Sequence, residues 1–99
     1  MTERKNPIAV FDSGIGGISV LRELIQVMPE EQFIFLGDSA NAPYGTRSLS
    51  DVRALTENAV HALIEEGAKE IVIACNTATS AAARSLRAKY HPRNSDHWN

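Results

Sequence analysis

The chain has 99 residues, of which 10 are basic and 12 acidic, so its formal net charge is −2. Hydrophobic residues make up 43% and charged residues 22%, a composition typical of one globular domain that excludes wholesale disorder. A near-neutral chain without a basic block offers no electrostatic attraction to nucleic acid. No apolar run approaches the roughly 20 residues that a membrane-spanning helix needs. We therefore expect a globular protein with neither a nucleic acid nor a membrane as partner.

The compartment is indicated by the N-terminus and by the cysteine content. Residues 1–7 carry charges, but no long apolar segment follows them, so we expect no secretory signal. Cys75 is the only cysteine, so an internal disulfide is excluded. Both observations favour a reducing, cytoplasmic setting.

The first half of the chain alternates between two hydrophobic periods. Residues 8–11 form a short apolar run that predicts a buried strand, and residues 33–36 form a second one. Between them, apolar residues recur every three or four positions from Ile18 to Met28, which predicts an amphipathic helix that Pro29 ends.

The second half repeats this alternation after a loop over residues 37–48. Ser48 or Ser50 is expected to cap a helix whose apolar face runs from Val52 to Ile64, with Gly67 in a left-handed conformation behind it. Residues 71–74 predict a third strand. Strong helix formers over residues 81–90 predict a last helix, with Thr79 or Ser80 as its cap.

The order β-α-β-α-β-α predicts an α/β fold in three layers, with a parallel sheet and right-handed crossovers. In such a sheet all loops that follow strands lie at one edge, where ligands bind. Here these are residues 12–17, 37–48 and 75–79, which concentrate the glycines, small hydroxyl residues and the thiol. The opposite loops, residues 29–32 and 67–70, look like plain connectors.

The first of these loops, residues 12–17, is rich in glycine and opens a helix, which suits an anion but also a tight turn that lets helix and strand pack closely. Gly14 and Gly16 begin a dinucleotide-binding pattern, with Asp38 as the acid, but Ser19 occupies the third glycine position. Asp12 has two interpretations as well: a turn cap, or a carboxylate that orients a reactive group.

The loop over residues 37–48 is open to two interpretations. It could be a surface loop with Tyr44 packed as a lid, which the local sequence favours, or its Tyr44 and Gly45 backbone amides could hold a ligand carboxylate. Asp38 is expected to cap this loop.

Cys75 directly follows a strand and precedes a helix. A cysteine is more often a small buried hydrophobic residue than a reactive one, but amides and the helix dipole at this position would stabilise a thiolate. Asn76, Thr77 and Thr79 surround it with hydrogen-bond donors. Such a thiolate would act as a proton acceptor, or as a nucleophile helped by residues from outside the chain.

Metal and cofactor chemistry find little support in the sequence. One cysteine and three scattered histidines, which we expect to be exposed, give no spacing for a metal site. No lysine lies in the loops of the ligand edge, which disfavours a pyridoxal Schiff base. The histidines are His61, His91 and His97.

Three motifs in this order closely resemble those of glutamate racemase, over about residues 7–90. They are Asp12-Ser13-Gly14-Ile15-Gly16-Gly17, the segment Gly37-Asp38-Ser39-Ala40-Asn41-Ala42-Pro43-Tyr44-Gly45, and Cys75-Asn76-Thr77-Ala78-Thr79. The resemblance implies interconversion of L- and D-glutamate without cofactor or metal, which supplies D-glutamate for peptidoglycan. It is also compatible with a homodimer.

The resemblance further implies a role for each matching residue. Cys75 would be one of two acid–base cysteines that face the substrate α-carbon from opposite sides, and Asp12 would assist its proton transfer. The substrate's amino and carboxylate groups would be held by Asp12, Ser13, Tyr44, Gly45, Asn76 and Thr77.

The chain also departs from the family, whose members have two domains and well over twice this length. The second domain carries the other cysteine in a Cys-Thr-His segment, which is missing from this sequence. We interpret residues 1–92 as part of a racemase N-terminal domain and residues 93–99 as a polar tail foreign to the family, the mark of a truncated or frame-shifted product rather than of a divergent native terminus.

We therefore expect the chain alone not to racemise glutamate at a useful rate. The alternatives are a non-catalytic or poorly folded fragment and an aspartate racemase relative. The motifs at Asp12-Ser13-Gly14 and Pro43-Tyr44-Gly45 favour glutamate over aspartate.

Overall fold

The computed structural model describes residues 6–90, so the expected tail at residues 93–99 lies outside the described part. Within these residues, three strands alternate with three α-helices, and two short 3-10 turns fill the loop before the second helix. In chain order these are β1 (Ile8–Asp12), α2 (Ile18–Val27), β2 (Phe33–Gly37), the turns Ser39–Asn41 and Tyr44–Thr46, α3 (Leu49–Glu65), β3 (Glu70–Ile73) and α4 (Asn76–Tyr90).

The sheet is parallel and has the strand order β2-β1-β3. The register pairs Ile8 of β1 with Phe33 of β2 and with Glu70 of β3. All five residues of β1 are buried, as their apolar run predicts for a central strand. Because the strands are parallel, the segments that follow them lie at one edge of the sheet.

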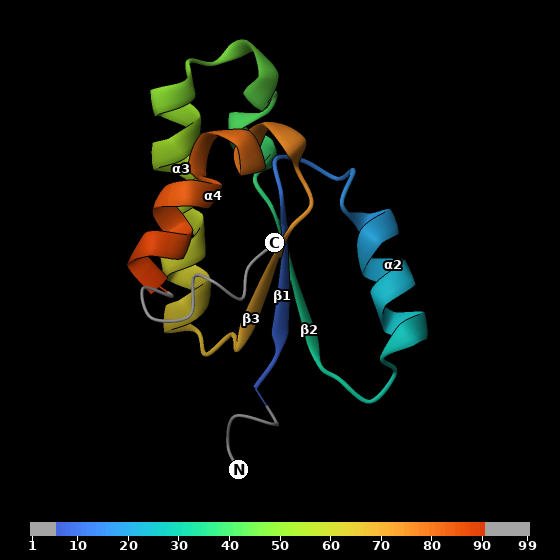
Figure 1. The fold of residues 1–99 in the computed structure, drawn as a ribbon. Helices are drawn as coiled ribbons and strands as arrows, with labels where there is room; N and C mark the ends of the chain where they lie inside the picture. The colour runs from blue at the N-terminus through green and yellow to red at the C-terminus, as the bar shows by residue number, and fades with distance from the viewer. Residues whose placement is uncertain (1–5, 91–99) are drawn as a thin grey trace.

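The helices form a layer on each side of this sheet (Figure 1), which confirms the predicted three-layer α/β architecture. Helix α2 lies on one face, and α3 and α4 lie together on the other. The α3–α4 pair is joined by side chains as well: Ser85 Oγ donates to a Glu57 carboxylate oxygen at 2.5 Å, and Arg53 Nε donates to the Ala81 carbonyl at 3.3 Å.

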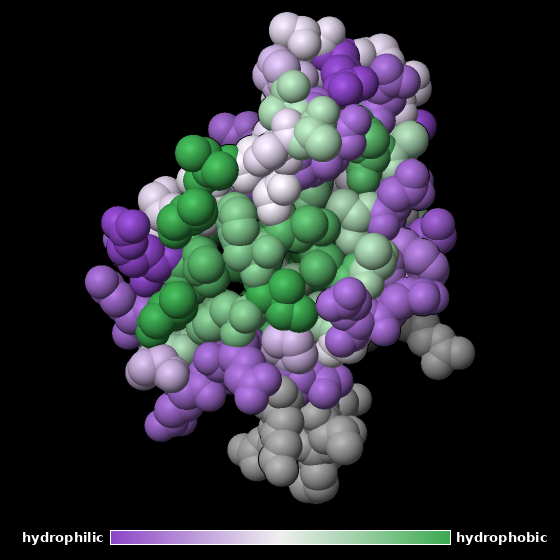
Figure 2. All heavy atoms as spheres, turned by 180° about the vertical axis from the view of Figure 1, so that it is seen from behind, coloured by the Kyte–Doolittle hydropathy of each residue, from purple (hydrophilic) through white to green (hydrophobic). Residues whose placement is uncertain are grey.

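The two faces of the sheet are unequally covered. The main cluster of buried residues connects β1 to α3, α4 and the loop between β2 and α3; its members are Ala9, Phe11, Tyr44, Val52, Leu63 and Ala78. By contrast, no residue of α2 is buried, and Val27 is 73% exposed. Apolar side chains gather alongside α2 on the face shown in Figure 2. The folded core therefore lies between the sheet and the α3–α4 layer.

Several predicted helix ends are confirmed. Ser48 caps α3, since its Oγ accepts the Asp51 N–H at 3.1 Å. Gly67 follows α3 with a φ of 99°, the left-handed conformation expected there. Helix α2 ends at Val27, just before Met28 and Pro29. None of the helices that the structure describes between residues 6 and 90 combines the length and the hydropathy of a membrane span.

The start of the last helix was predicted wrongly. Helix α4 begins at Asn76, five residues before the predicted Ala81, so Thr79 and Ser80 lie inside the helix rather than capping it. The residue before the helix is Cys75, whose carbonyl accepts the Thr79 N–H at 3.0 Å and whose sulfur accepts the Ala78 N–H at 3.4 Å. These two bonds close the first turn and outweigh the weak helix propensity of threonine and serine.

Candidate functional site

The carboxyl edge of the sheet brings two distant segments into contact at Cys75. The thiol of Cys75 donates to Ser13 Oγ at 3.5 Å, across a separation of 62 residues. The strand register explains this meeting, because Phe11 of β1 pairs with Ile73 of β3 and both chains leave the sheet directly afterwards. The predicted grouping of the first and third loops at one site is therefore observed.

Cys75 combines partial burial with hydrogen-bond donors. It is half-buried and packs against the cluster that contains Tyr44 and Ala78. Its sulfur lies at the N-terminus of α4, where the Ala78 N–H points at it from 3.4 Å. The free N–H groups and the dipole of a helix N-terminus favour negative charge. A free cysteine usually acts as a small hydrophobic packing residue. The sulfur of Cys75 differs in lying at a helix N-terminus, a position suited to an anion.

Asp12 ends β1 and is 7% exposed. Its Oδ2 accepts the Gly14 N–H at 3.0 Å, so the carboxylate closes the turn that begins the first loop. This contact is the turn cap considered for Asp12. A carboxylate oxygen has further lone pairs, so the same group retains the capacity to accept from a ligand or a neighbouring thiol.

The first loop lies so close to β2 that two glycines are required. A Cβ atom on Gly37 would collide with the carbonyl oxygen of Gly14, and one on Gly17 would lie 2.8 Å from Cβ of Asp12. At Gly14 a Cβ would meet nothing within 4 Å. The pattern of glycines alone did not reveal that Gly37, outside the glycine-rich motif, sets the height of this loop above the sheet.

Tyr44 belongs to the core, so the prediction of a surface loop with Tyr44 as a lid was wrong. The side chain is 1% exposed, and its ring centroid lies 6.2 Å from that of Phe11. Its hydroxyl donates to Asp38 Oδ2 at 2.6 Å. Burial, and then the bond to Asp38 and its negative charge, raise the pKa of Tyr44 far above its ordinary value.

Asp38 organises the second loop differently from the predicted cap. It makes no side-chain bond to the backbone of the 3-10 turn that follows, but accepts from the side chains of Tyr44 and, at 3.0 Å, Asn41. Arg47 Nε in turn donates to the Asn41 carbonyl at 2.9 Å. The aspartate thus ties together a loop that contains Gly45. An acid after the strand with a tyrosine six residues later was the signal available for this bond.

Asn76 and Thr77 form the first turn of α4, directly beside Cys75. Asn76 is exposed and Thr77 half-buried, so both can be reached from the open edge of the sheet. His61 lies in α3 and is exposed, as predicted, whereas His91 and His97 lie outside the described residues. Within residues 6–90, no group of three or more histidine, cysteine or acidic side chains could hold a metal ion.

These features define a class: an α/β protein with a parallel sheet, whose carboxyl edge carries a thiol at a helix N-terminus. The thiol donates to a serine that directly follows a buried aspartate. No family model matches the sequence. Among curated proteins, the glutamate racemase of Clostridium novyi is 59% identical over 86 residues, which are 87% of this chain and 33% of the relative. That of Bifidobacterium adolescentis is 60% identical over 84 residues, or 85% and 33%.

Solved structures agree with these relatives. A glutamate racemase from Thermus thermophilus in complex with β-chloro-D-alanine has a TM-score of 0.84 at 45% identity and covers 87% of this chain and 34% of that one. One from Francisella tularensis in complex with D-glutamate has a TM-score of 0.81 at 38% identity, covering 85% and 32%. The chain is homologous to the N-terminal portion of glutamate racemases and spans about a third of their length.

Proposed function

We propose that this site binds glutamate and carries one of the two acid–base groups of a cofactor-independent racemase. The observation that supports it most directly is the Cys75 sulfur, which lies between Ser13 Oγ and the first turn of α4. The motifs around it occur in a chain 59% identical to a glutamate racemase over 86 residues. A solved relative contains D-glutamate.

The proposed step is a proton transfer at the α-carbon of glutamate. The thiolate of Cys75 takes the α-proton, and the electron pair of the C–H bond moves into the substrate carboxylate. Because that charge is unfavourable, the carboxylate needs preorganised donors. Ser13, Asn76 and Thr77, together with the Tyr44 and Gly45 amides, would supply them, and Asp12 would assist the proton transfer and hold the substrate's amino group.

Racemisation also needs a proton delivered to the opposite face of the resulting carbanion. The chain has one cysteine, so we propose that it deprotonates one enantiomer and returns a proton to the same face. A complete enzyme of this kind would supply D-glutamate for peptidoglycan in the cytoplasm. This chain alone would exchange the α-hydrogen of glutamate with solvent and leave its stereochemistry unchanged.

The experiment follows both outcomes in deuterated water. The chain is incubated with L-glutamate and, separately, with D-glutamate, while proton NMR monitors the α-hydrogen and circular dichroism monitors the optical activity. We expect exchange with one enantiomer, no change of optical activity, and loss of exchange in Cys75→Ala. A suitable control is Ser80→Ala, because Ser80 is exposed on the same helix.

Two results would contradict the proposal in different ways. Conversion of one enantiomer into the other would show that a second cysteine is not needed. Absence of both exchange and any glutamate-induced shift in the amide spectrum of the folded chain would reject the glutamate site itself and favour a non-catalytic fragment.

A further inference from the structure

Asn41 joins the two ends of the loop between β2 and α3. Its backbone N–H donates to the Asp38 carbonyl at 3.2 Å, and its side-chain Nδ2 donates to the Asp38 carboxylate at 3.0 and 3.1 Å. Its backbone carbonyl accepts Arg47 Nε at 2.9 Å, and its Oδ1 accepts Arg47 Nη2 at 3.5 Å. All four polar groups of Asn41 therefore serve to connect Asp38 with Arg47.

These bonds enclose a segment whose exposed part has little else to hold it. Tyr44 is anchored in the core, and its hydroxyl donates to the same Asp38 carboxylate. Gly45 is exposed, and a Cβ built on it would meet nothing within 4 Å. Because Gly45 has no side chain to pack, the position of its backbone depends on the bonds at the two ends of the segment.

Building on the proposed function, we propose that Asn41 is a positioning residue, which holds the Tyr44 and Gly45 amides where the substrate carboxylate binds. Asn41 acts through these amides and not by touching the substrate. An asparagine side chain offers a donor and an acceptor at once, so one residue fixes both ends of the segment. Donors that are already in place before the ligand arrives need not be ordered on binding.

Asn41→Asp changes the polarity of this connection and keeps its shape. The new carboxylate cannot donate to Asp38, and two like charges then face each other at hydrogen-bond distance. We expect the dissociation constant for glutamate, measured by NMR titration of the full chain, to rise about tenfold.

The distribution of the glutamate-induced shifts separates positioning from a general defect. At saturating glutamate, the shifts of the Tyr44 and Gly45 amides should be smaller in Asn41→Asp than in the original chain. Those of the Asn76 and Thr77 amides should be unchanged. A merely structural role would reduce the signals of all four amides together, through the loss of folded chain.

The exchange of the two side chains supplies a rescue. In the double variant Asp38→Asn, Asn41→Asp, the amide at position 38 donates to the carboxylate at position 41 and keeps an oxygen for the Tyr44 hydroxyl. The dissociation constant should return nearly to its original value. Ser39→Asp is the charge control, because Ser39 is exposed in the same turn, and it should change the constant far less than Asn41→Asp does.

A second variant tests the other end of the connection. In Arg47→Lys, a single ammonium replaces the planar guanidinium and cannot reproduce both bonds to Asn41, so the affinity for glutamate should again fall. Arg53→Lys is the matched control, because Arg53 Nε also donates to a backbone carbonyl, that of Ala81, but outside this loop. It should leave the affinity unchanged.

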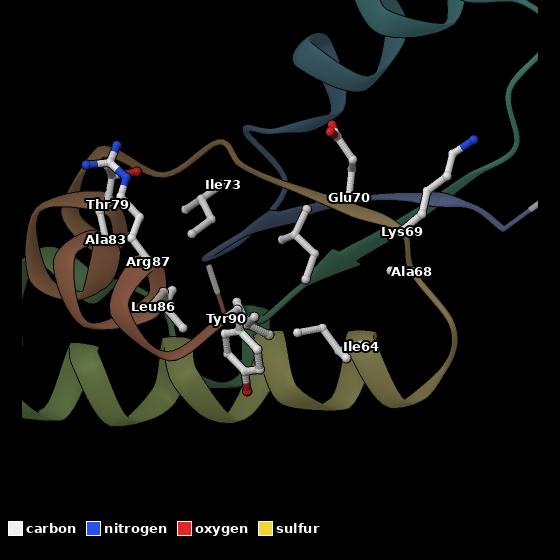
Figure 3. Close-up of a pocket in the computed structure, with 12 residues that line it drawn as sticks. Ile64, Ala68, Lys69, Glu70, Ile73, Thr79, Ala83, Leu86, Arg87 and Tyr90 are labelled. Carbon is white, nitrogen blue, oxygen red and sulfur yellow. The ribbon is translucent and has the colours of Figure 1, made fainter. Parts of the chain in front are cut away.

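The packed layer provides an internal reference for the fold. A groove of about 430 Å³ between β3 and the α3–α4 layer is lined by none of the loop residues (Figure 3). The methyl signals of Ile73 and Leu86, which line this groove, should stay in place in all of these variants. If Asn41→Asp displaces them, the pair Arg47→Lys and Arg53→Lys decides the question.

The outcomes separate this role from the proposed function. If the original chain binds glutamate and Asn41→Asp binds it equally well, the positioning role is wrong and the glutamate site stands. A double variant as weak as Asn41→Asp, or equal losses in Ser39→Asp, would also overturn the role. An original chain that binds no glutamate would reject the proposed function, and the role of Asn41 with it.

Discussion

The hydroxyl of Tyr44 and the carboxylate of Asp38 form a 2.6 Å hydrogen bond that holds the loop between β2 and α3. Tyr44 is 1% exposed, so bulk water does not reach its hydroxyl and cannot take over the hydrogen bond that it makes to Asp38. The same loop contains Gly45, one of the residues expected to contact substrate. A core interaction therefore supports the geometry of a proposed binding loop.

Tyr44→Phe should lower the free energy of unfolding by about 1–3 kcal/mol, because it leaves the Asp38 carboxylate without its shortest donor. Urea denaturation of the two proteins measures this difference. Tyr90→Phe is the control, because the Tyr90 hydroxyl makes only a long, exposed contact of 3.5 Å with His61. Equal losses in the two variants would show that the Asp38 bond contributes nothing special.

The environment of the Tyr44 hydroxyl should also make the free energy of unfolding depend on pH in the alkaline range. The folded pKa of Tyr44 is raised, chiefly by burial, so the protonated native state is favoured relative to the unfolded chain. The resulting stability is fully present below the unfolded tyrosine pKa of about 10 and is lost as the pH rises from there toward the folded value.

The tyrosinate absorbance provides the measurement, because the chain contains two tyrosines, Tyr44 and Tyr90. The part of the absorbance that belongs to Tyr44 should appear only together with the loss of the far-ultraviolet dichroism. In Tyr44→Phe that part should disappear. Ionisation of Tyr44 in a protein that keeps its native dichroism would contradict the structure.

Gly37→Ala should disturb the ligand edge without touching the thiol. Its Cβ would collide with the Gly14 carbonyl oxygen, so either the first loop or the end of β2 must move. Overpacking of this kind typically costs about 1–3 kcal/mol. We expect that loss of stability and a weaker response of the chain to glutamate, measured by denaturation and by NMR titration.

Gly45→Ala supplies the comparison for stability, because a Cβ on Gly45 meets nothing within 4 Å. Its effect on unfolding should be small or slightly stabilising, since alanine restricts the unfolded chain. If Gly37→Ala were as stable as Gly45→Ala, the first loop would move aside without lowering the free energy of unfolding, and the prediction would be wrong.

The sequence predicted the parts of this fold that depend on local pattern. The apolar runs located all three strands, and the spacing from Ile18 to Met28 located α2, because strand and helix periods differ along the chain. The predicted start of α4 was wrong because threonine and serine have low helix propensity, while the two hydrogen bonds to Cys75 that overcome it form only in the completed turn. The prediction for Tyr44 was wrong for a similar reason: its burial requires Phe11, which is distant in sequence.

The geometry of the candidate site was likewise predictable only in part. Parallel strands imply that their following loops share an edge, so the meeting of Ser13 and Cys75 was predictable from topology. The close approach of Gly14 to Gly37 was not, because it depends on how far the first loop folds down over β2.

Cys75 acts both as a helix cap and as the proposed base, and two substitutions separate these roles. Serine keeps an acceptor for the Ala78 N–H, whereas alanine removes it. Cys75→Ser should therefore unfold at about the same urea concentration as the original chain, while Cys75→Ala should lose about 0.5–2 kcal/mol, the usual cost of losing a cap. Both should lose α-hydrogen exchange of glutamate, because a serine hydroxyl is a far weaker acid than a thiol and yields no comparable base. Exchange that survives in Cys75→Ser would place the base on another residue, and equal stability of the two variants would remove the sulfur from the capping of α4.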